Sequence, residues 1–112
     1  MISTSGRASP GGGAAAPTLG WLEKRGARNT GFKRRFFVLD PDARVLSYFR
    51  ELPEPAPLSA IPLAALRALP RQRDVTRAGR RQHGLVLETA EGTVFLGAEG
   101  EQERDEWVVA LR

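Results

Sequence analysis

The sequence predicts a small, mostly β domain in which seven short antiparallel strands curl into a barrel or sandwich and one C-terminal α-helix caps an open end. Short apolar runs alternate with turns rich in Gly, Pro and Asp through residues 19–98. The segment 100–112 instead places its apolar residues at helical spacing. A chain of 112 residues is long enough for one core only.

The first 18 residues are set apart by composition. They are almost entirely Gly, Ala, Ser, Thr and Pro, with Arg7 as the one charge, so residues 1–18 are predicted to be disordered and residues 19–112 to form the domain. The start has no apolar stretch of the kind found in secretion signals, and Cys is absent, so a cytoplasmic location is expected. The chain ends inside the expected helix, which is consistent with a truncated helix and a fragment of a longer protein.

The strands are assigned from alternation and from the turns between them. Gly26 ends the first, Asp40–Ala43 forms a turn after the second, and Ala90–Gly92 marks the last hairpin. Three prolines predict an irregular connection at residues 51–57. Residues 74–81 are predicted to form a polar, basic loop. The predicted strands are Leu19–Arg25, Phe32–Leu39, Val45–Arg50, Leu58–Leu63, Leu66–Arg71, Leu85–Thr89 and Thr93–Ala98.

The helix follows at Gly100–Arg112. Acidic residues occupy its first turn, where they favour the helix dipole, and Trp107, Val108 and Leu111 share one apolar face. Trp107 is therefore expected in the core. Trp21 is expected to face outward from the first strand, and His83 is expected at the surface.

The charge lies mainly in the first half. Residues 1–50 hold nine Lys and Arg against three Asp and Glu, a net +6, whereas residues 51–112 hold eight against ten, a net −2. A basic half indicates an anionic partner, namely nucleic acid, a membrane surface or a phosphorylated ligand. With one His and no Cys, the chain offers no nucleophile–base pair or metal cluster, so no enzyme activity, cofactor or metal is expected.

The two-residue alternation of the predicted strands brings four hydrogen-bond donor side chains together at one end of the barrel. Lys24 shares a face with Leu22, and Lys33 and Arg35 share a face with Phe37. Charges cannot lie unpaired in a dry core, so they must emerge at the open mouth of the barrel. Tyr48, from the third strand, reaches the same mouth. Two ammonium groups, a guanidinium and a phenol form a set of phosphate donors.

These segments resemble the pleckstrin homology (PH) family. The strings GWLEKRG at 20–26, FKRRFFVLD at 32–40 and LSYF at 46–49 resemble its opening strands, and TVFLGAEGEQERDEWVVALR at 93–112 resembles its last strand and helix. The resemblance implies a PH-type fold and, more closely, the subset that binds 3-phosphorylated phosphoinositides. It implies the headgroup-binding residues Lys24, Lys33, Arg35 and Tyr48, with Arg25, Ala27, Arg28 and Arg34 as accessory positions.

The resemblance also implies roles. Arg35 would bind the 3-phosphate with both nitrogens, Tyr48 would donate to the 4-phosphate, and Lys24 and Lys33 would complete the site. Ala27 stands where binders of the 3,4,5-trisphosphate often have Gly, which favours the 3,4-bisphosphate. Two departures from tight binders are the uncharged stretch Ala56–Leu58 and the acidic Glu91 in the last hairpin.

The implied function is recruitment of a cytoplasmic protein to the plasma membrane or another phosphoinositide-bearing membrane, by a monomeric domain. The alternative is a PH-type module that binds a protein partner with weak or no lipid binding. Nucleic-acid binding is disfavoured because the charge concentrates in one pocket. For the arginines of residues 71–81, a solvated loop and a second contact with anionic lipid both remain open.

Overall fold

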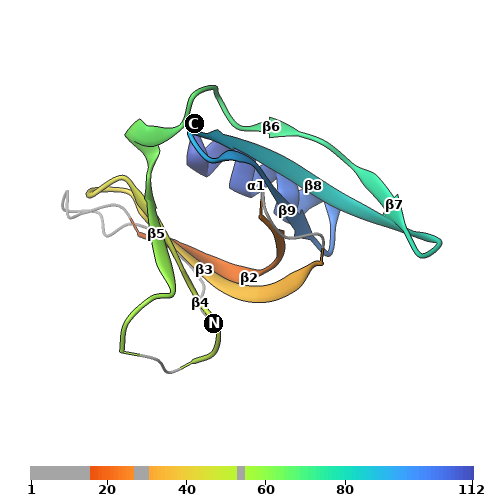
Figure 1. Ribbon diagram of the computed structural model, residues 1–112, viewed down its shortest axis with the longest axis horizontal. Coiled ribbons are helices and arrows are strands. Elements are labelled where there is room, and N and C mark those ends of the chain that lie inside the picture. The colour runs from red at the N-terminus through yellow and green to blue at the C-terminus, as the bar shows by residue number, and fades with distance from the viewer. Residues whose placement is uncertain (1–15, 27–30, 53–54) are drawn as a thin grey trace.

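The computed structural model describes residues 16–26, 31–52 and 55–112. These residues form eight strands, a single 3-10 turn and one α-helix (Figure 1). The elements are β2 (Thr18–Arg25), β3 (Lys33–Asp40), β4 (Val45–Phe49), β5 (Ser59–Pro62), η1 (Leu63–Ala65), β6 (Arg71–Gln72), β7 (Val75–Arg77), β8 (Arg80–Thr89), β9 (Gly92–Ala98) and α1 (Glu101–Leu111).

The strands form one sheet in the order β5-β4-β3-β2-β9-β8-β6, with β7 paired to β8 alone. All the pairings are antiparallel. β2 pairs with β3 along almost its whole length but with β9 only through Glu23–Arg25, so its first half diverges from β9. The sheet thus wraps around a core, as the predicted mostly β fold requires.

The pairing defines two ends of the sheet. Lys24 lies opposite Lys33, and Thr89 lies opposite Gly92, so the β2–β3, β4–β5 and β8–β9 connections share one end, called here the open end. The β3–β4 turn, the β7–β8 turn and the start of α1 lie at the far end. In Figure 1 the β7–β8 turn projects at the right, and the β4–β5 connection hangs at the lower left.

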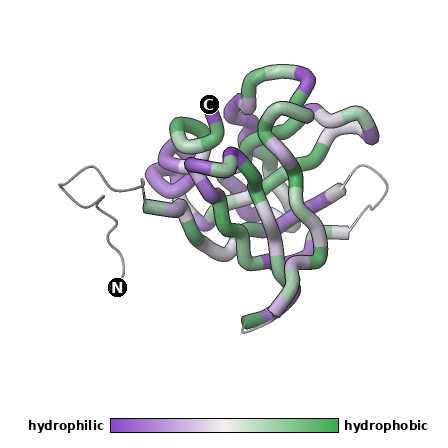
Figure 2. Tube along the Cα trace, turned by 90° about the vertical axis from the view of Figure 1, so that its left-hand side faces the viewer, coloured by the Kyte–Doolittle hydropathy of each residue, from purple (hydrophilic) through white to green (hydrophobic). Residues whose placement is uncertain are grey.

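The core is built from alternate residues of β2, β3 and β4, from runs of consecutive buried residues in β8 and β9, and from one face of the helix. Figure 2 shows hydrophobic and hydrophilic residues interspersed along the chain. As predicted, Leu22, Phe37 and Leu46 are buried, and Trp107 is 1% exposed. Trp21 faces outward and is half-buried. Its ring lies edge-on to the Phe36 ring, with 5.3 Å between the ring centroids. The predicted helix face is confirmed by the burial of Trp107, Val108 and Leu111.

The prediction of a loop at residues 74–81 is wrong. Val75–Arg77 forms β7, and β8 begins at Arg80 instead of Leu85, which gives eight strands among the described residues where seven were predicted. The two-residue turn between them holds Ala78 at φ 52° and Gly79 at φ 76°, the positive angles typical of a type I′ hairpin. Ala is rare at such an angle, so Ala78-Gly79 is not a recognisable turn signal in the sequence.

The predicted strand Leu66–Arg71 is also wrong. Only Arg71–Gln72 pairs as a strand, and the residues before it are irregular. The backbone N–H of Leu66 donates to Leu63 O at 3.1 Å, and that of Arg67 donates to Glu88 O at 2.8 Å. Pro70 has no N–H to continue a ladder. At the N-terminus β2 begins at Thr18, one residue early, and residues 1–15 of the predicted disordered tail lie outside the described residues.

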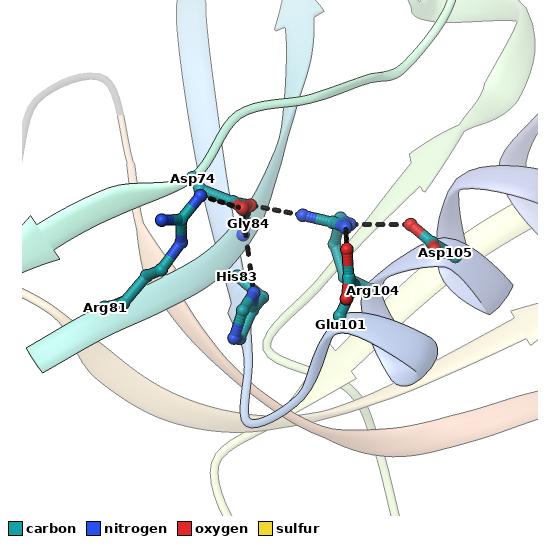
Figure 3. A network of polar contacts seen from close by, with 7 residues as sticks. All are labelled: Asp74, Arg81, His83, Gly84, Glu101, Arg104 and Asp105. Atoms are coloured by element: carbon teal, nitrogen blue, oxygen red, sulfur yellow. Dashed lines mark hydrogen bonds and ion pairs between the residues drawn. The ribbon is translucent and has the colours of Figure 1, made fainter.

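A buried ion-pair network joins the helix to the sheet (Figure 3). Arg104 of α1 is 1% exposed, and its guanidinium donates to Asp74, Asp105 and Glu101. Asp74 also accepts hydrogen bonds from the Gly84 N–H at 3.2 Å and from Arg81 at 3.3 Å. The carboxylate of Asp74 therefore links three parts of the fold: the connection before β7, the strand β8 and the helix.

His83 lies beside this network and not at the open surface expected for it. Its side chain is 24% exposed, and Nδ1 lies 3.6 Å from Asp74 Oδ2. Among the described residues this nitrogen is buried without a hydrogen-bond partner. The error arose because β8 begins earlier than predicted, which places His83 inside a paired strand.

Gly84 is needed where two segments approach closely. A Cβ at this position would lie 2.2 Å from the Phe95 ring and 2.6 Å from the backbone oxygen of Arg73. We expect Gly84→Ala to lower the free energy of unfolding by about 1–3 kcal/mol, the usual cost of overpacking. Urea denaturation would measure the change. Gly79→Ala, a position with open space around it, serves to separate crowding from backbone strain.

Candidate functional site

Three cationic side chains and one phenol line a single pocket at the open end. Its volume is about 190 Å³, and no acidic residue lines it among the parts of the chain that the structure describes. The lining residues are Lys24, Gly26, Lys33, Arg35, Tyr48 and Leu58. The structure thus brings together all four residues that the sequence placed at one spot.

The strand register explains why these side chains meet. Lys24 of β2 lies directly opposite Lys33 of β3, on the face that carries Leu22 and Phe37 into the core. Tyr48 of β4 lies opposite Phe37, so it shares that face. Each of these strands runs from the core toward the open end or back from it, and its last inward position holds a polar side chain.

The two opposed lysines carry an electrostatic cost. Like charges directly across an antiparallel pair are destabilising, because their β-carbons lie only about 5 Å apart. Arg35 adds a third positive charge to the same pocket. An anion placed among these groups would remove the repulsion, so the arrangement is suited to binding negative charge rather than to stabilising the fold.

Local contacts hold the donors in place. Lys24 Nζ lies 5.0 Å from the centroid of the Tyr48 ring, a cation–π distance. Tyr48 packs against the buried Phe37 with 5.3 Å between ring centroids. Arg35 Nη1 donates to the backbone oxygen of Arg34 at 3.0 Å, which leaves its other donors available to a ligand. A phosphate could be met by a fork of N–H groups, two ammonium groups and a hydroxyl.

A second cavity adjoins the first and gives room for a ligand larger than one phosphate. It measures about 390 Å³ and shares Lys24, Gly26 and Tyr48 with the basic pocket. It extends between β5 and the β8–β9 turn, where Glu91 forms part of its wall. This side is less basic, so a ligand's negative charge is best placed near Lys33 and Arg35.

The accessory positions divide into three kinds. Arg34 points to the outer face, where its guanidinium lies 4.8 Å from the centroid of the Trp21 ring. Arg25 is exposed, and its guanidinium lies 5.9 Å from the centroid of the Phe32 ring. Neither lines the basic pocket. Ala27 and Arg28 lie outside the described residues.

The tip of the arginine-rich segment 71–81 is placed away from the basic pocket, whereas Arg73 lines a neighbouring cavity together with Arg25 and Gly26. Arg81 pairs with Asp74 at 3.3 Å, and Arg71 pairs with Glu88 at 3.0 Å. The β7–β8 turn lies at the far end of the sheet (Figure 1). Its tip therefore does not face the same surface as the pocket, which favours the interpretation of a solvated segment.

Sequence reasoning missed two residues of the pocket. Leu58 was assigned to a strand, but it precedes β5, and its backbone N–H donates to Tyr48 O at 2.8 Å. Gly26 was interpreted only as a strand end. A Cβ on Gly26 would lie 3.0 Å from Lys24 Nζ, so the absent side chain makes room for the lysine. The signal for Gly26 was its position two residues after Lys24.

The family is decided by comparison with known proteins. A family model described as the PH domain matches residues 18–112.

The chain belongs to the PH-domain family.

Solved structures agree with this assignment. The C-terminal PH domain of human pleckstrin is 30% identical, with a TM-score of 0.63 over 84% of this chain and 82% of that one. The PH domain of human oxysterol binding protein-related protein 11 is 28% identical, with a TM-score of 0.68 over 93% and 82%. Comparison with curated protein sequences gave no match.

Two of the similar structures contain an inositol pentakisphosphate. One of them is the C-terminal PH domain of pleckstrin in complex with D-myo-Ins(1,2,3,4,5)P5, 28% identical, with a TM-score of 0.60 over 84% of this chain and 92% of that chain. PH domains in general are phosphoinositide-binding or protein-interaction modules and not enzymes. In the described part of this PH domain, no helix is long and apolar enough to cross a membrane. No group of three or more His, Cys, Asp or Glu residues there could hold a metal ion.

Proposed function

We propose that this PH domain binds the headgroups of 3-phosphorylated inositol lipids in the basic pocket, the 3,4-bisphosphate or the 3,4,5-trisphosphate. Binding would recruit its host protein from the cytoplasm to the plasma membrane or to another membrane that carries these lipids. The observation that carries the proposal is the direct opposition of Lys24 and Lys33 beside Arg35 in one pocket without an acidic wall residue among those described.

The donor chemistry supports a phosphorylated ligand over a carboxylate. Arg35 offers a planar fork that matches two phosphate oxygens, whereas each lysine offers a point charge to a neighbouring phosphate. Tyr48 supplies a neutral donor at the pocket's edge. The adjoining cavity gives the inositol ring space between β5 and the β8–β9 turn. The inositol pentakisphosphate complex of the pleckstrin domain is consistent with such a ligand.

We expect Arg35→Ala to weaken headgroup binding by about 2–5 kcal/mol, since it removes a charged hydrogen-bonding partner of the phosphate. Isothermal titration with soluble inositol phosphates of each phosphorylation pattern, at near-physiological salt, would measure the loss. Arg34→Ala is the matched control, because Arg34 has the same chemistry one residue away but stacks on Trp21 at the outer face. We expect the control to change binding much less.

Equal losses of affinity for the two variants, with unchanged thermal stability, would contradict a specific pocket. They would indicate that a diffuse basic surface attracts the ligand. Tight binding of inositol phosphates that lack the 3-phosphate would contradict the proposed specificity. Salt matters in each titration because low ionic strength exaggerates nonspecific attraction between exposed charges. Absence of binding by the unmodified domain would favour the alternative function, a protein-interaction module.

A further inference from the structure

The outer face of β2, β3 and β4 is apolar. An antiparallel sheet that covers a core with one face commonly carries polar side chains on the other. Here six outward-facing residues are apolar and at least partly exposed, and they belong neither to the buried core cluster nor to the residues packed against it. We call these residues the outer patch: Leu19, Trp21, Phe36, Val38, Val45 and Phe49.

The strand register arranges the outer patch in rows. Trp21 lies opposite Phe36, and Phe36 lies opposite Phe49, so a row of aromatic side chains crosses three strands. Leu19 and Val38 lie opposite each other in the next row. Aromatic residues are enriched where two proteins bury surface against each other, and such rows are typical of a surface that another protein covers.

A pair of opposite charges borders the aromatic row on the side of the open end. Glu23 of β2 lies directly opposite Arg34 of β3, and the Arg34 guanidinium lies 4.8 Å from the centroid of the Trp21 ring. Such a pair is complementary to itself, because a half-turn sets each charge of one copy against the opposite charge of another. Charge complementarity therefore selects a second copy of this chain as the occupant of the outer patch.

We propose that the outer patch is the interface of a two-fold symmetric dimer. Its axis runs parallel to the strands, between β2 and β3, and the two sheets pack face to face about 10 Å apart. The rotation places β3 of the second copy over β2. Trp21 then faces Phe36 of the second copy, Glu23 faces Arg34 of the second copy, and each contact occurs twice. The dimer replaces the monomer that the sequence resemblance implies.

The charges exclude the other simple arrangement, in which the axis crosses the strands along the aromatic row. That rotation would place Glu23 and Arg34 against Leu19 and Val38 of the second copy. Charges buried against apolar side chains without a partner are costly. The axis parallel to the strands instead pairs every charge and keeps apolar residues together.

A hollow beside Trp21 provides space for a side chain of the second copy. Its volume is about 570 Å³, and its walls include Trp21 and Glu23 on one side and Ala78 and Arg80 of the β7–β8 hairpin on the other. β4 lies one strand beyond β3, so the proposed axis carries Phe49 of the second copy past Trp21 to this hollow. The dimer would thus fill it with an aromatic ring.

The dimer leaves both basic pockets open. An axis parallel to the strands keeps the two open ends pointing the same way, and the basic pocket lies on the inner side of the sheet, opposite to the outer patch. This inference therefore goes beyond the proposed function and does not rest on it. Variants of the outer patch should bind soluble inositol phosphate with unchanged affinity.

Sedimentation equilibrium of the full chain, from about 10 μM to about 1 mM, tests the dimer. We expect Arg34→Glu and Glu23→Arg each to raise the dissociation constant more than about tenfold, because each sets like charges against each other at two places. An equimolar mixture of the two variants should form the dimer again, since each introduced charge then faces its opposite. The double variant should recover it as well.

Leu19→Ser tests the apolar part of the interface. Leu19 is 50% exposed, so its replacement leaves the core intact, and we expect the dissociation constant to rise about tenfold because the dimer contains this side chain twice. Leu69→Ser is the matched control, since Leu69 is 69% exposed but lies outside the outer patch. The control should leave the dissociation constant unchanged.

Three results would overturn the dimer. The first is a monomer mass for the unmodified chain over the whole concentration range. Iodide quenching of Trp21 fluorescence then shows whether another segment of the chain or a different protein covers the patch, because Trp107 is 1% exposed and protected. The second is a dimer that Leu19→Ser and the two charge variants leave unchanged, which places the interface elsewhere. The third is a mixture of the charge variants that stays monomeric.

Discussion

Trp107→Ala is expected to lower the free energy of unfolding by about 3–5 kcal/mol, the usual cost of removing a buried aromatic side chain. Trp107 is 1% exposed, and its ring meets the Phe37 ring edge-on with 6.5 Å between centroids. The indole also lies over Gly20 of β2, at a place where a Cβ would be 3.7 Å away. The loss is comparable with the whole stability of many small domains, so the variant should be largely unfolded near body temperature.

Urea denaturation followed by circular dichroism would measure this change. Val109→Ala is the control on the same helix, because Val109 is 75% exposed and should cost little. If Trp107→Ala unfolds at the same urea concentration as the unmodified domain, the helix does not close the core in solution. Trp107→Phe should recover part of the loss, since a smaller ring still reaches Phe37.

Asp74→Asn is expected to lower the free energy of unfolding by about 3 kcal/mol at neutral pH. Breaking a buried ion pair leaves an uncompensated charge in the interior, which costs about 3–5 kcal/mol. Arg104 keeps its contacts to Asp105 at 2.7 Å and Glu101 at 3.4 Å, so the lower part of that range applies. Asp105→Asn should cost less, because the Asp105 side chain is 57% exposed.

The effect of Asp74→Asn should also depend on pH. Burial alone would raise the pKa of Asp74, but hydrogen bonds from Arg104, Gly84 and Arg81 outweigh burial and hold the pKa below its ordinary value. A depressed carboxyl pKa stabilises the fold above the unfolded pKa, about 3.9, and that stabilisation is lost as pH falls through the folded pKa. The stability difference between the two proteins should therefore be largest near neutral pH and shrink below about pH 4.

The pKa of Glu103 shifts in the opposite direction, so its effect on the comparison between Asp74→Asn and the unmodified domain must be considered. Burial raises its pKa, and the nearby charges of Glu99 and Glu106 raise it further. Its titration is common to both proteins and cancels in their difference. Denaturation at a series of pH values would record the difference directly. A difference that stays constant down to about pH 2 would show that the carboxylate charge of Asp74 contributes nothing to stability.

The open end could be predicted because it depends on local alternation. Once Phe37 and Leu46 are assigned to the core, the two-residue period of a strand fixes the faces of Arg35 and Tyr48. The hairpin between β2 and β3 then brings Lys24 next to Lys33. Each inference needed only neighbours in sequence, and the structure places all four donors in one pocket.

The far end could not be predicted because it depends on distant partners. Arg104 lies among charged residues of the helix, so the sequence indicates an exposed side chain. Its burial is explained only by the contact with Asp74, which lies thirty residues earlier in the chain. The hairpin that carries Asp74 onto the helix turns at Ala78 and Gly79, which do not form a strong turn signal. His83 was misplaced for the same reason, since its strand was expected to start later.

The opposed lysines have a consequence for protein engineering. Replacing Lys33 with a threonine would relieve a cross-strand repulsion and fit the strand well, so a redesign guided by thermal stability alone would favour that change. The same change would remove one of the three cations of the basic pocket, in which we propose that the headgroup binds. Stabilisation of this domain should therefore begin at positions far from the β2–β3 hairpin, where no ligand makes use of an unfavourable interaction.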